Sequence, residues 1–403
     1  MTLKVRKSSL ILLLLTLYGV NYFVFERLLF FNELLSLIGF VYFIKYSFRG
    51  NYKFYYPQNL IYRCILLLII LFGLYALISI YLKTNWYYYF RNMSMIYSIF
   101  GFFIGYNLYL EQYAFFNRIK GAIYGYALLA FLISPALGIS NLIDRNAYSF
   151  WFAFLQKNWK PLSLLLFILI NILYFLSYTS LTVMIILIFV LGIVVFIRSY
   201  TRFKVLIVTA IITFCILFAQ AIPYLKLYKD NYSLFGDVEY VYSQHPVFRI
   251  DDNTSWRLIF WYRTLVEIFP ENLIGIGIGT PILPYTQGVT TSDLIFSDEH
   301  VAHVIGTHNT FITVFMRFGI LSFILLAIIY REVFREFFYY KKYYLKNKND
   351  GGIFIGFIVL TIVGMFNLLI ETPTLSILYW VSLGFLARAV YHRKIKSYEV
   401  QNL

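Results

Sequence analysis

Four of the five histidines and three of the arginines gather in one polar stretch of an otherwise apolar chain, residues 222–308. A neutral histidine can take a proton from a hydroxyl group, and an arginine offers a fork of donors that matches phosphate oxygens. Together these residue types are typical of a group-transfer site, in which a base activates a hydroxyl and cations bind an anionic leaving group. The polar stretch is therefore where the sequence predicts chemistry.

Arg257 and Arg263 lie six positions apart in the segment NTSWRLIFWYRTLVEIF, residues 253–269. The apolar residues around them have helical spacing, which predicts a short amphipathic helix at a membrane surface. Two interpretations fit this pair. Either both arginines bind one shared anion through its phosphate oxygens, or they contact lipid headgroups only.

Gly275, Gly277 and Gly279 alternate with isoleucine. Their spacing differs from a dinucleotide-binding fingerprint, and no strand–turn–helix pattern surrounds them. The pattern predicts a tight turn or a close approach of the backbone to a neighbouring element. A nest of backbone amides that faces a phosphate is the alternative.

His300 and His303, together with Asp298 and Glu299, are candidate metal ligands. Zinc enzymes often carry two histidines four positions apart on a helix, with a glutamate between them. These two histidines are three positions apart, with Val and Ala between them. Solvated loop histidines are the simpler interpretation, and no metal or other cofactor is expected.

His308 stands where the polar stretch meets the next apolar run, so it is predicted to face the rim of a cavity at the membrane surface. In that place it would act as a general base. Asn309 would cap the following helix or position a sugar hydroxyl.

Arg317 lies nine residues into that apolar run, about 13 Å deep in a helix that rises about 1.5 Å per residue. A charge inside a membrane is costly and is a functional candidate by default. We expect Arg317 either to face the substrate cavity or to pair with a buried carboxylate, for which Glu26, Glu33 and Glu371 are the candidates. Glu371 would border the same cavity from the outer end of a later apolar run.

The composition of the chain indicates that these residues belong to a membrane protein. The chain has 403 residues, of which 61% are hydrophobic and 13% are charged, against about 25% charged residues in an ordinary soluble domain. The net charge of +15 lies mainly in short connections between apolar runs, as the positive-inside rule expects. The sequence therefore predicts an all-α polytopic membrane protein and excludes a soluble enzyme and a nucleic-acid binder.

Eleven apolar runs are long enough to cross a bilayer, at about 9–25, 28–44, 64–82, 93–110, 121–139, 161–178, 181–197, 205–221, 309–330, 353–370 and 374–390. Basic residues place both ends of the chain on the same side, which an odd number of crossings contradicts. A further crossing is therefore predicted at Asn146–Gln156. The expected result is about twelve transmembrane helices with both termini cytoplasmic, divided into an N-terminal bundle (1–221), a large outer loop domain (222–308) and C-terminal helices (309–403).

The order of these features resembles the O-antigen ligase and O-antigen polymerase superfamily of bacterial inner-membrane glycosyltransferases. The matching segments are RLIFW from Arg257, NLIGIGIG from Asn272, HNTF from His308, Gly319-Ile320 and a final helix pair that holds Glu371. The chain departs from many members at Ser177–Ser180, where they carry Ser-Arg, and at Arg317, where they carry an acidic residue.

The resemblance implies a GT-C-like fold and metal-independent, inverting transfer of a glycan from undecaprenyl diphosphate on the periplasmic face of the inner membrane. The implied partners are lipid-linked donor and acceptor glycans, membrane lipids and a chain-length regulator, with no nucleic acid. In the implied site His308 is the general base. Five further residues bind the diphosphate or the substrate: Arg257, Arg263, Asn309, Arg317 and Glu371.

The main functional prediction is a polymerase of lipid-linked repeat units in the biosynthesis of lipopolysaccharide or a similar surface polysaccharide. The surplus of Tyr, Phe, Ile, Asn and Lys is typical of an AT-rich gene, and polysaccharide gene clusters are often AT-rich. A ligase that passes the finished glycan to the lipid A core is the first alternative. A flippase for lipid-linked oligosaccharides is the second, and the arginines and histidines of the outer segment favour an enzyme over it.

Overall fold

The computed structural model describes residues 7–20, 31–47, 59–83, 86–136, 273–280, 282–285, 294–296, 302–304, 308–340 and 350–401, together with Trp261 and Thr264. These residues belong to two compact units. The first unit holds the described residues up to Leu74, from Asn92 to Ala136 and from Ile324 onward. The second unit holds Tyr75–Arg91 and the described residues from Trp261 to Phe323.

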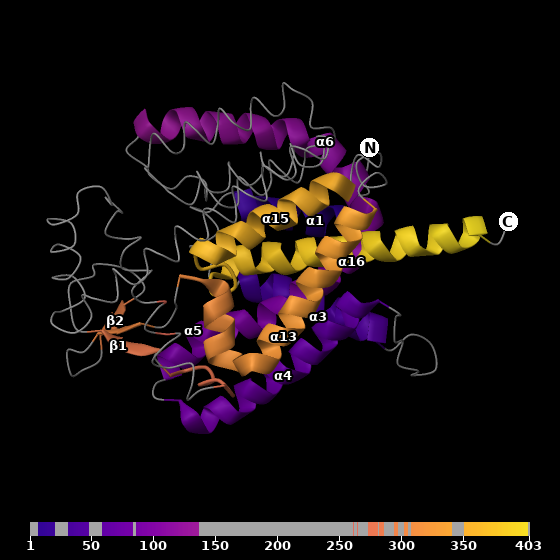
Figure 1. The fold of residues 1–403 in the computed structure, drawn as a ribbon. Helices are drawn as coiled ribbons and strands as arrows, with labels where there is room; N and C mark the ends of the chain where they lie inside the picture. Colours follow the sequence, from indigo (N-terminus) through magenta and orange to yellow (C-terminus); the bar gives the residue numbers. More distant parts are fainter. Residues whose placement is uncertain are drawn as a thin grey trace, which may run out of the picture. The chain divides into compact units, whose positions relative to one another are not determined.

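Helices dominate the described residues. They are α1 (Lys7–Val20), α3 (Phe31–Ser47), α4 (Leu60–Leu82), α5 (Trp86–Tyr97), the short 3-10 turn η1 (Ser98–Phe100), α6 (Gly101–Ala136), α13 (Thr310–Tyr339), α15 (Asp350–Phe366) and α16 (Pro373–Gln401), as labelled in Figure 1. Three strands of three residues each, β1 (Leu283–Tyr285), β2 (Leu294–Phe296) and β3 (Ala302–Val304), pair antiparallel in the order β1-β3-β2. Apart from these short strands in the polar stretch, the described fold is helical as predicted.

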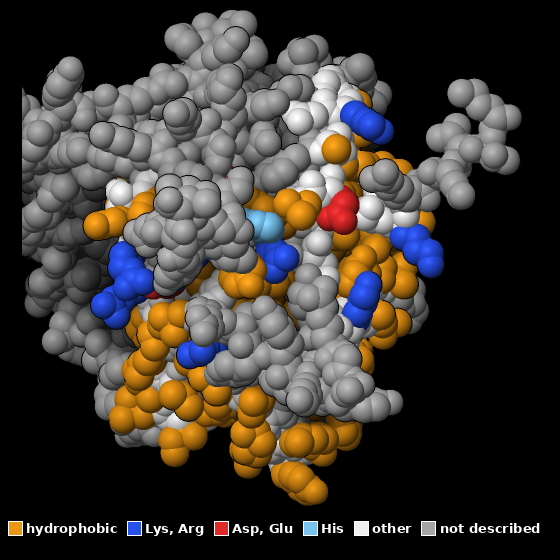
Figure 2. Space-filling model, turned by 90° about the vertical axis from the view of Figure 1, so that its right-hand side faces the viewer, with side chains coloured by type: hydrophobic (Ala, Val, Ile, Leu, Met, Phe, Trp, Pro, Cys, Tyr) orange, Lys and Arg blue, Asp and Glu red, His pale blue; other side chains and the backbone are white. Residues whose placement is uncertain are grey.

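Among the described residues, four helices are long and apolar enough to cross a membrane, at Leu60–Leu82, Trp86–Gln112, Thr310–Tyr339 and Pro373–Lys394. Large hydrophobic side chains are exposed along α4, where only 28% of the apolar window is buried. Figure 2 shows hydrophobic side chains gathered over the lower part of the face that it presents. Apolar helices with exposed hydrophobic side chains indicate a membrane protein.

Helix α6 corrects one detail of the predicted crossings. The apolar runs 93–110 and 121–139 are predicted to be separate crossings, whereas α6 continues without a break for 36 residues from Gly101 to Ala136. Residues 111–120, EQYAFFNRIK, contain neither glycine nor proline, so they carry no signal that ends a helix. At about 1.5 Å per residue the helix is longer than the hydrocarbon core of a bilayer, about 30 Å. The prediction of two separate crossings at 93–110 and 121–139 is therefore wrong.

Helices α6 and α16 pack side by side and in the same direction in the first unit. A Cβ atom at Gly105 would lie 1.9 Å from the carbonyl oxygen of Val381, and one at Gly384 would lie 2.0 Å from that of Phe102. Only glycine permits such close backbones, as at many helix contacts in membranes. Helix α3 follows the same direction against η1, where a Cβ at Gly39 would lie 2.2 Å from the oxygen of Phe100. The common direction agrees with the predicted topology, in which the runs 28–44, 93–110 and 374–390 all cross from the outer to the inner side.

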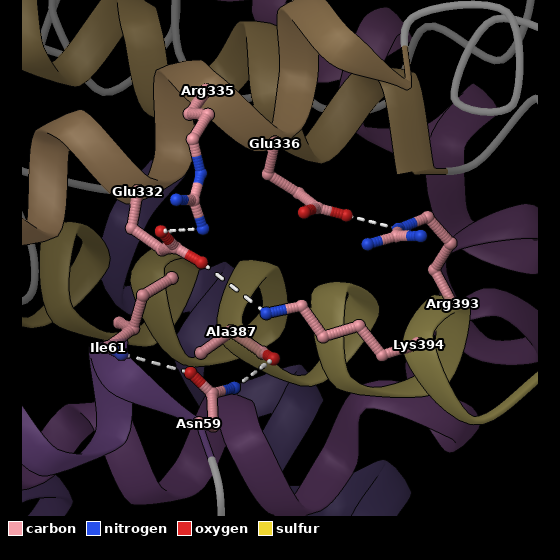
Figure 3. A network of polar contacts seen from close by, with 8 residues as sticks. All are labelled: Asn59, Ile61, Glu332, Arg335, Glu336, Ala387, Arg393 and Lys394. Atoms are coloured by element: carbon pink, nitrogen blue, oxygen red, sulfur yellow. Dashed lines mark hydrogen bonds and ion pairs between the residues drawn. The ribbon is translucent and has the colours of Figure 1, made fainter. Parts of the chain in front are cut away.

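A polar network joins the carboxyl ends of α13 and α16 in the first unit (Figure 3). The carboxylate of Glu332 forms ion pairs with the Nη2 of Arg335 at 2.5 Å and with the Nζ of Lys394 at 3.4 Å. Glu336 pairs with Arg393, and both side chains are buried. Charges of opposite sign remain buried at low cost only when they are paired, so this network fixes the end of α13 alongside α16.

Asn59 adds a second polar contact in the same network (Figure 3). Its Oδ1 accepts a hydrogen bond from the amide of Ile61 at 3.0 Å, which caps the start of α4. Its Nδ2 donates to the carbonyl of Ala387 at 2.8 Å. One buried side chain thus caps the start of α4 and holds that helix to α16.

Candidate functional site

Residues 273–280, LIGIGIGT, form an extended segment that we call the glycine strap, and it belongs to the second unit. Gly275, Gly277 and Gly279 have φ values of 96°, 74° and 85°. Side chains other than hydrogen are disfavoured at such angles, so the spacing of the three glycines sets the path of the strap. The prediction of a tight backbone approach is confirmed.

The strap lies directly against a break in α13. The helix is interrupted at Gly319, which has φ 71° and ψ −177°. The amides of Ile276 and Gly277 donate to the carbonyls of Met316 and Arg317 at 2.8 and 2.9 Å, and the amide of Ile320 donates to the carbonyl of Leu273 at 2.9 Å. A broken helix at membrane depth is tolerated only where other groups satisfy the freed backbone. The strap supplies those groups.

Arg317 is fully buried and fastens the strap a second time. Its Nη1 donates to the carbonyls of Gly277 at 3.0 Å and Thr280 at 2.7 Å. Its own carbonyl is the acceptor for the amide of Gly277. The described contacts thus give Arg317 a part in holding the strap, while the predicted contact with substrate stays a prediction.

Helix α4 holds the opposite edge of the strap through side chains that sequence reasoning missed. Tyr75 donates to the carbonyl of Ile274, and the buried Oγ of Ser79 accepts from the amide of Ile278 at 2.9 Å. The two residues are four apart, so they share one face of α4. A polar pair at helical spacing inside the apolar run 64–82 was the available signal.

These contacts test the interpretation of the glycine run as a nest of amides at three of its positions. The amides of Ile276, Gly277 and Ile278 all donate to acceptors within the protein. An amide that is already bonded inward cannot also cradle a phosphate. The nest of amides at these three positions is therefore wrong.

His308 and Asn309 form the entry to α13, in the second unit. His308 has φ 51°, the one non-glycine residue with positive φ in the described part of the chain, and it is partly exposed. Such a backbone conformation costs about 1–3 kcal/mol, and residues that adopt it are often found at functional sites. The Oδ1 of Asn309 accepts from the amides of Phe311 at 3.0 Å and Ile312 at 3.2 Å. The predicted helix cap is confirmed, and a contact of Asn309 with a sugar hydroxyl stays a prediction.

Three other predicted positions fall outside the described residues, and a fourth lies on a strand. Arg257, Arg263 and His300 lie outside the described residues. His303 lies on β3, opposite Pro284 and Ile295. Within the described part of the chain, no three His, Cys, Asp or Glu residues form a group that could hold a metal ion.

Glu371 belongs to the first unit, two residues before α16 begins. It is partly buried, and its backbone carbonyl accepts from the Oγ of Ser94 at 3.5 Å. Glu33, another predicted partner of Arg317, accepts instead from the hydroxyl of Tyr97 at 2.5 Å. The Arg317 guanidinium donates hydrogen bonds to the backbone carbonyls of Gly277 and Thr280, in the second unit.

Replacing Arg317 by methionine tests its role in holding the strap. The change leaves the buried carbonyl of Gly277 without this donor, at about 1–3 kcal/mol, and also frees the partly buried carbonyl of Thr280. The melting temperature of the purified protein should therefore fall. Arg317→Lys should recover most of the stability, because an ammonium group also donates to carbonyls. Wild-type stability of Arg317→Met would contradict the role of Arg317 as a fastener.

Comparison with known families gives one match. The model of the family described as O-antigen ligase matches residues 162–327. This range contains both predicted arginines, the glycine strap, His308, Asn309 and Arg317, and it ends before Glu371. No curated protein matches the chain. Residues 162–327 are thus similar to the O-antigen ligase family, and this match supports the resemblance to the O-antigen ligase and polymerase superfamily.

Proposed function

We propose that the protein is a glycosyltransferase that polymerises undecaprenyl-diphosphate-linked repeat units into O-antigen or a similar surface polysaccharide. The observation that carries this proposal is the conformation of His308 at the entry of α13. His308 is partly exposed, has a strained backbone conformation and directly precedes the cap of α13. The glycine strap hydrogen-bonds to the break in α13 on one edge and to Ser79 of α4 on the other. The arrangement suits a general base whose position must stay fixed while successive substrates bind and leave.

In the proposed reaction, His308 takes the proton of an acceptor sugar hydroxyl. The hydroxyl oxygen forms a bond to the anomeric carbon of the donor from the side opposite the diphosphate. The bond between that carbon and the diphosphate oxygen breaks, and undecaprenyl diphosphate leaves with the electron pair. Configuration at the anomeric carbon inverts. Arg257 and Arg263 stabilise the charge that develops on the leaving group, with Asn309, Arg317 and Glu371 as further substrate contacts.

The proposed setting is the bacterial inner membrane. The chain crosses it several times in a GT-C-like fold, with both termini in the cytoplasm and the segment 222–308 in the periplasm. The positive charge of the connections supports this orientation, as does the common direction of α3, α6 and α16. The partners are the lipid-linked donor and acceptor, membrane lipids and a regulator of chain length.

Reconstitution of the purified protein with the undecaprenyl-diphosphate-linked repeat unit tests the proposal. We expect a ladder of multiples on a gel, unchanged by a chelator of divalent metal ions. Loss of the ladder in EDTA, restored by zinc, would contradict the metal-independent mechanism. Absence of any product would contradict the polymerase.

A ligase is the second candidate, because the description of the matching family is O-antigen ligase. In the same assay a ligase would give no ladder, but would transfer the glycan once lipid A core is added. If neither reaction occurs while lipid-linked glycan moves across the vesicle membrane, the protein is a flippase.

A further inference from the structure

An exposed pair of aromatic rings lies at the start of α5, in the second unit. Trp86 and Phe90 are four positions apart, so they share one face of the helix. Their ring centroids are 5.7 Å apart, and the ring planes are 21° from parallel. The two side chains are 53% and 65% exposed. The pair therefore presents a flat apolar surface, which we call the aromatic platform.

A buried tyrosine holds the aromatic platform in place. The ring of Tyr89 packs edge-on against both exposed rings, with its centroid 5.6 Å from each. Its hydroxyl donates to the carbonyl of Ala76, on α4, at 2.9 Å, and the side chain is 6% exposed. The platform is thus preformed and fastened to α4, which lowers the entropic cost of binding a ligand.

The aromatic platform adjoins the end of the glycine strap. A Cβ atom at Gly279 would lie 2.8 Å from the Cβ of Lys83 and 3.1 Å from the Cβ of Tyr89. The hydroxyl of Thr280 donates to the carbonyl of Leu82 at 3.4 Å. The strap is bonded in turn to the break in α13. It therefore connects the platform to the helix at whose entry the proposed transfer site lies.

Lys83 adds hydrogen-bond donors beside the aromatic platform. Its Nζ lies 3.9 Å from the ring centroid of Trp86 and donates to the carbonyl of Ile80 at 2.5 Å. An ammonium group has three donors, so it can also donate to a ligand on the rings. Lys83 lies between the candidate membrane helices Leu60–Leu82 and Trp86–Gln112. A partly exposed ammonium group at that place indicates that the platform meets water at the membrane surface.

This combination of rings and ammonium group fits a sugar ring better than a lipid. A pyranose ring has a flat face of C–H groups and a rim of hydroxyl groups. The flat face matches the faces of aromatic rings, which carry partial negative charge, and the rim hydroxyls accept hydrogen bonds from an ammonium group. A lipid acyl chain packs equally well on any apolar side chain and offers no acceptor. A lipid phosphate would bind the ammonium group but gains nothing from nearly parallel rings.

We propose that Trp86 and Phe90 bind a sugar ring of the glycan by stacking, with Lys83 as a donor to its hydroxyl groups. The inference rests on the proposed function for the identity of the glycan, and deepens it by naming residues that recognise the sugar. In the orientation proposed above, the connection between α4 and α5 lies on the periplasmic side, as the lipid-linked glycan does. The platform then holds the glycan beside the strap.

Binding of the free glycan tests this inference without catalysis. The probe is the oligosaccharide released by mild acid from the lipid-linked repeat unit, titrated into the purified protein in detergent by calorimetry. We expect binding by the wild type and about tenfold weaker binding by Phe90→Leu, in the range of single aromatic contacts. Phe90→Tyr keeps the ring and should bind as the wild type does. Phe323→Leu is the matched control, because Phe323 is an exposed phenylalanine of the same unit that meets Phe315 edge-on.

Leucine separates a sugar site from a membrane anchor, because it stays apolar but has no ring face. If the rings only contact lipid, Phe90→Leu binds the oligosaccharide unchanged, which overturns the inference. Absence of binding by the wild type, loss of binding in Phe90→Tyr, or equal loss in Phe323→Leu also overturns it. Because the assay contains no diphosphate and no turnover, binding together with a failed polymerisation assay would refute the proposed function and leave the sugar site in place.

Discussion

Replacing His308 by alanine is expected to lower polysaccharide chain extension by at least about a hundredfold, the usual contribution of a general base. The variant should still reside in the membrane at wild-type levels, because Asn309 and not His308 provides the cap of α13. The length distribution of the polysaccharide in a strain that carries only the variant measures the effect, with membrane content followed by immunoblot.

Two further variants make this result specific. His392→Ala removes a histidine that stacks on Tyr109 in the first unit, with ring centroids 5.4 Å apart, and it should leave chain extension unchanged. His308→Gly removes the imidazole but accepts the positive φ without strain. It should be as inactive as His308→Ala and melt at a higher temperature. Normal chain length in His308→Ala, or recovered activity in His308→Gly, would show that the imidazole is not the base.

Local chemistry in the sequence predicted the parts of the site that depend on backbone geometry alone. Alternating glycines predicted a close approach, and the strap has three positive φ angles. Asn309 before an apolar run predicted a cap, and its side chain bonds two amides of α13. These features depend on a few neighbouring residues, so no knowledge of the tertiary fold was needed.

Features that depend on distant segments could not be predicted in the same way. Ser79 and Ile278 are 199 positions apart, and no pattern in either segment predicts that the two are in contact. Arg317 was expected to meet a carboxylate or a substrate, whereas it bonds backbone carbonyls, which every residue possesses and no sequence pattern reveals. The two separate crossings predicted at 93–110 and 121–139 are a local error, because residues 111–120 contain neither glycine nor proline and the helix continues through them. Tertiary contacts decided the cases of Ser79 and Arg317.

Replacing Gly275 by alanine is expected to damage both stability and activity, because its position admits no side chain. Its φ of 96° lies where a Cβ atom is strained, at a cost of about 1–2 kcal/mol from the backbone angle alone. The added Cβ would also lie 2.5 Å from the amide nitrogen of Gly319 and 2.8 Å from the carbonyl oxygen of Arg317. Both are backbone atoms and cannot rotate away. The strap would have to move off α13 and release the hydrogen bonds that satisfy the break in the helix.

Thermal unfolding of purified Gly275→Ala should therefore begin several degrees below that of the wild type, and chain extension should fall with it. Gly73→Ala is the matched control, because a Cβ at that position of α4 meets nothing within 4 Å. Alanine also favours a helix over glycine by about 1 kcal/mol, so this control should melt at or above the wild-type temperature. Wild-type stability of Gly275→Ala would mean that the strap can leave α13 without cost. The break at Gly319 would then need another source of hydrogen bonds, and the strap could not be what holds the helix entered at His308.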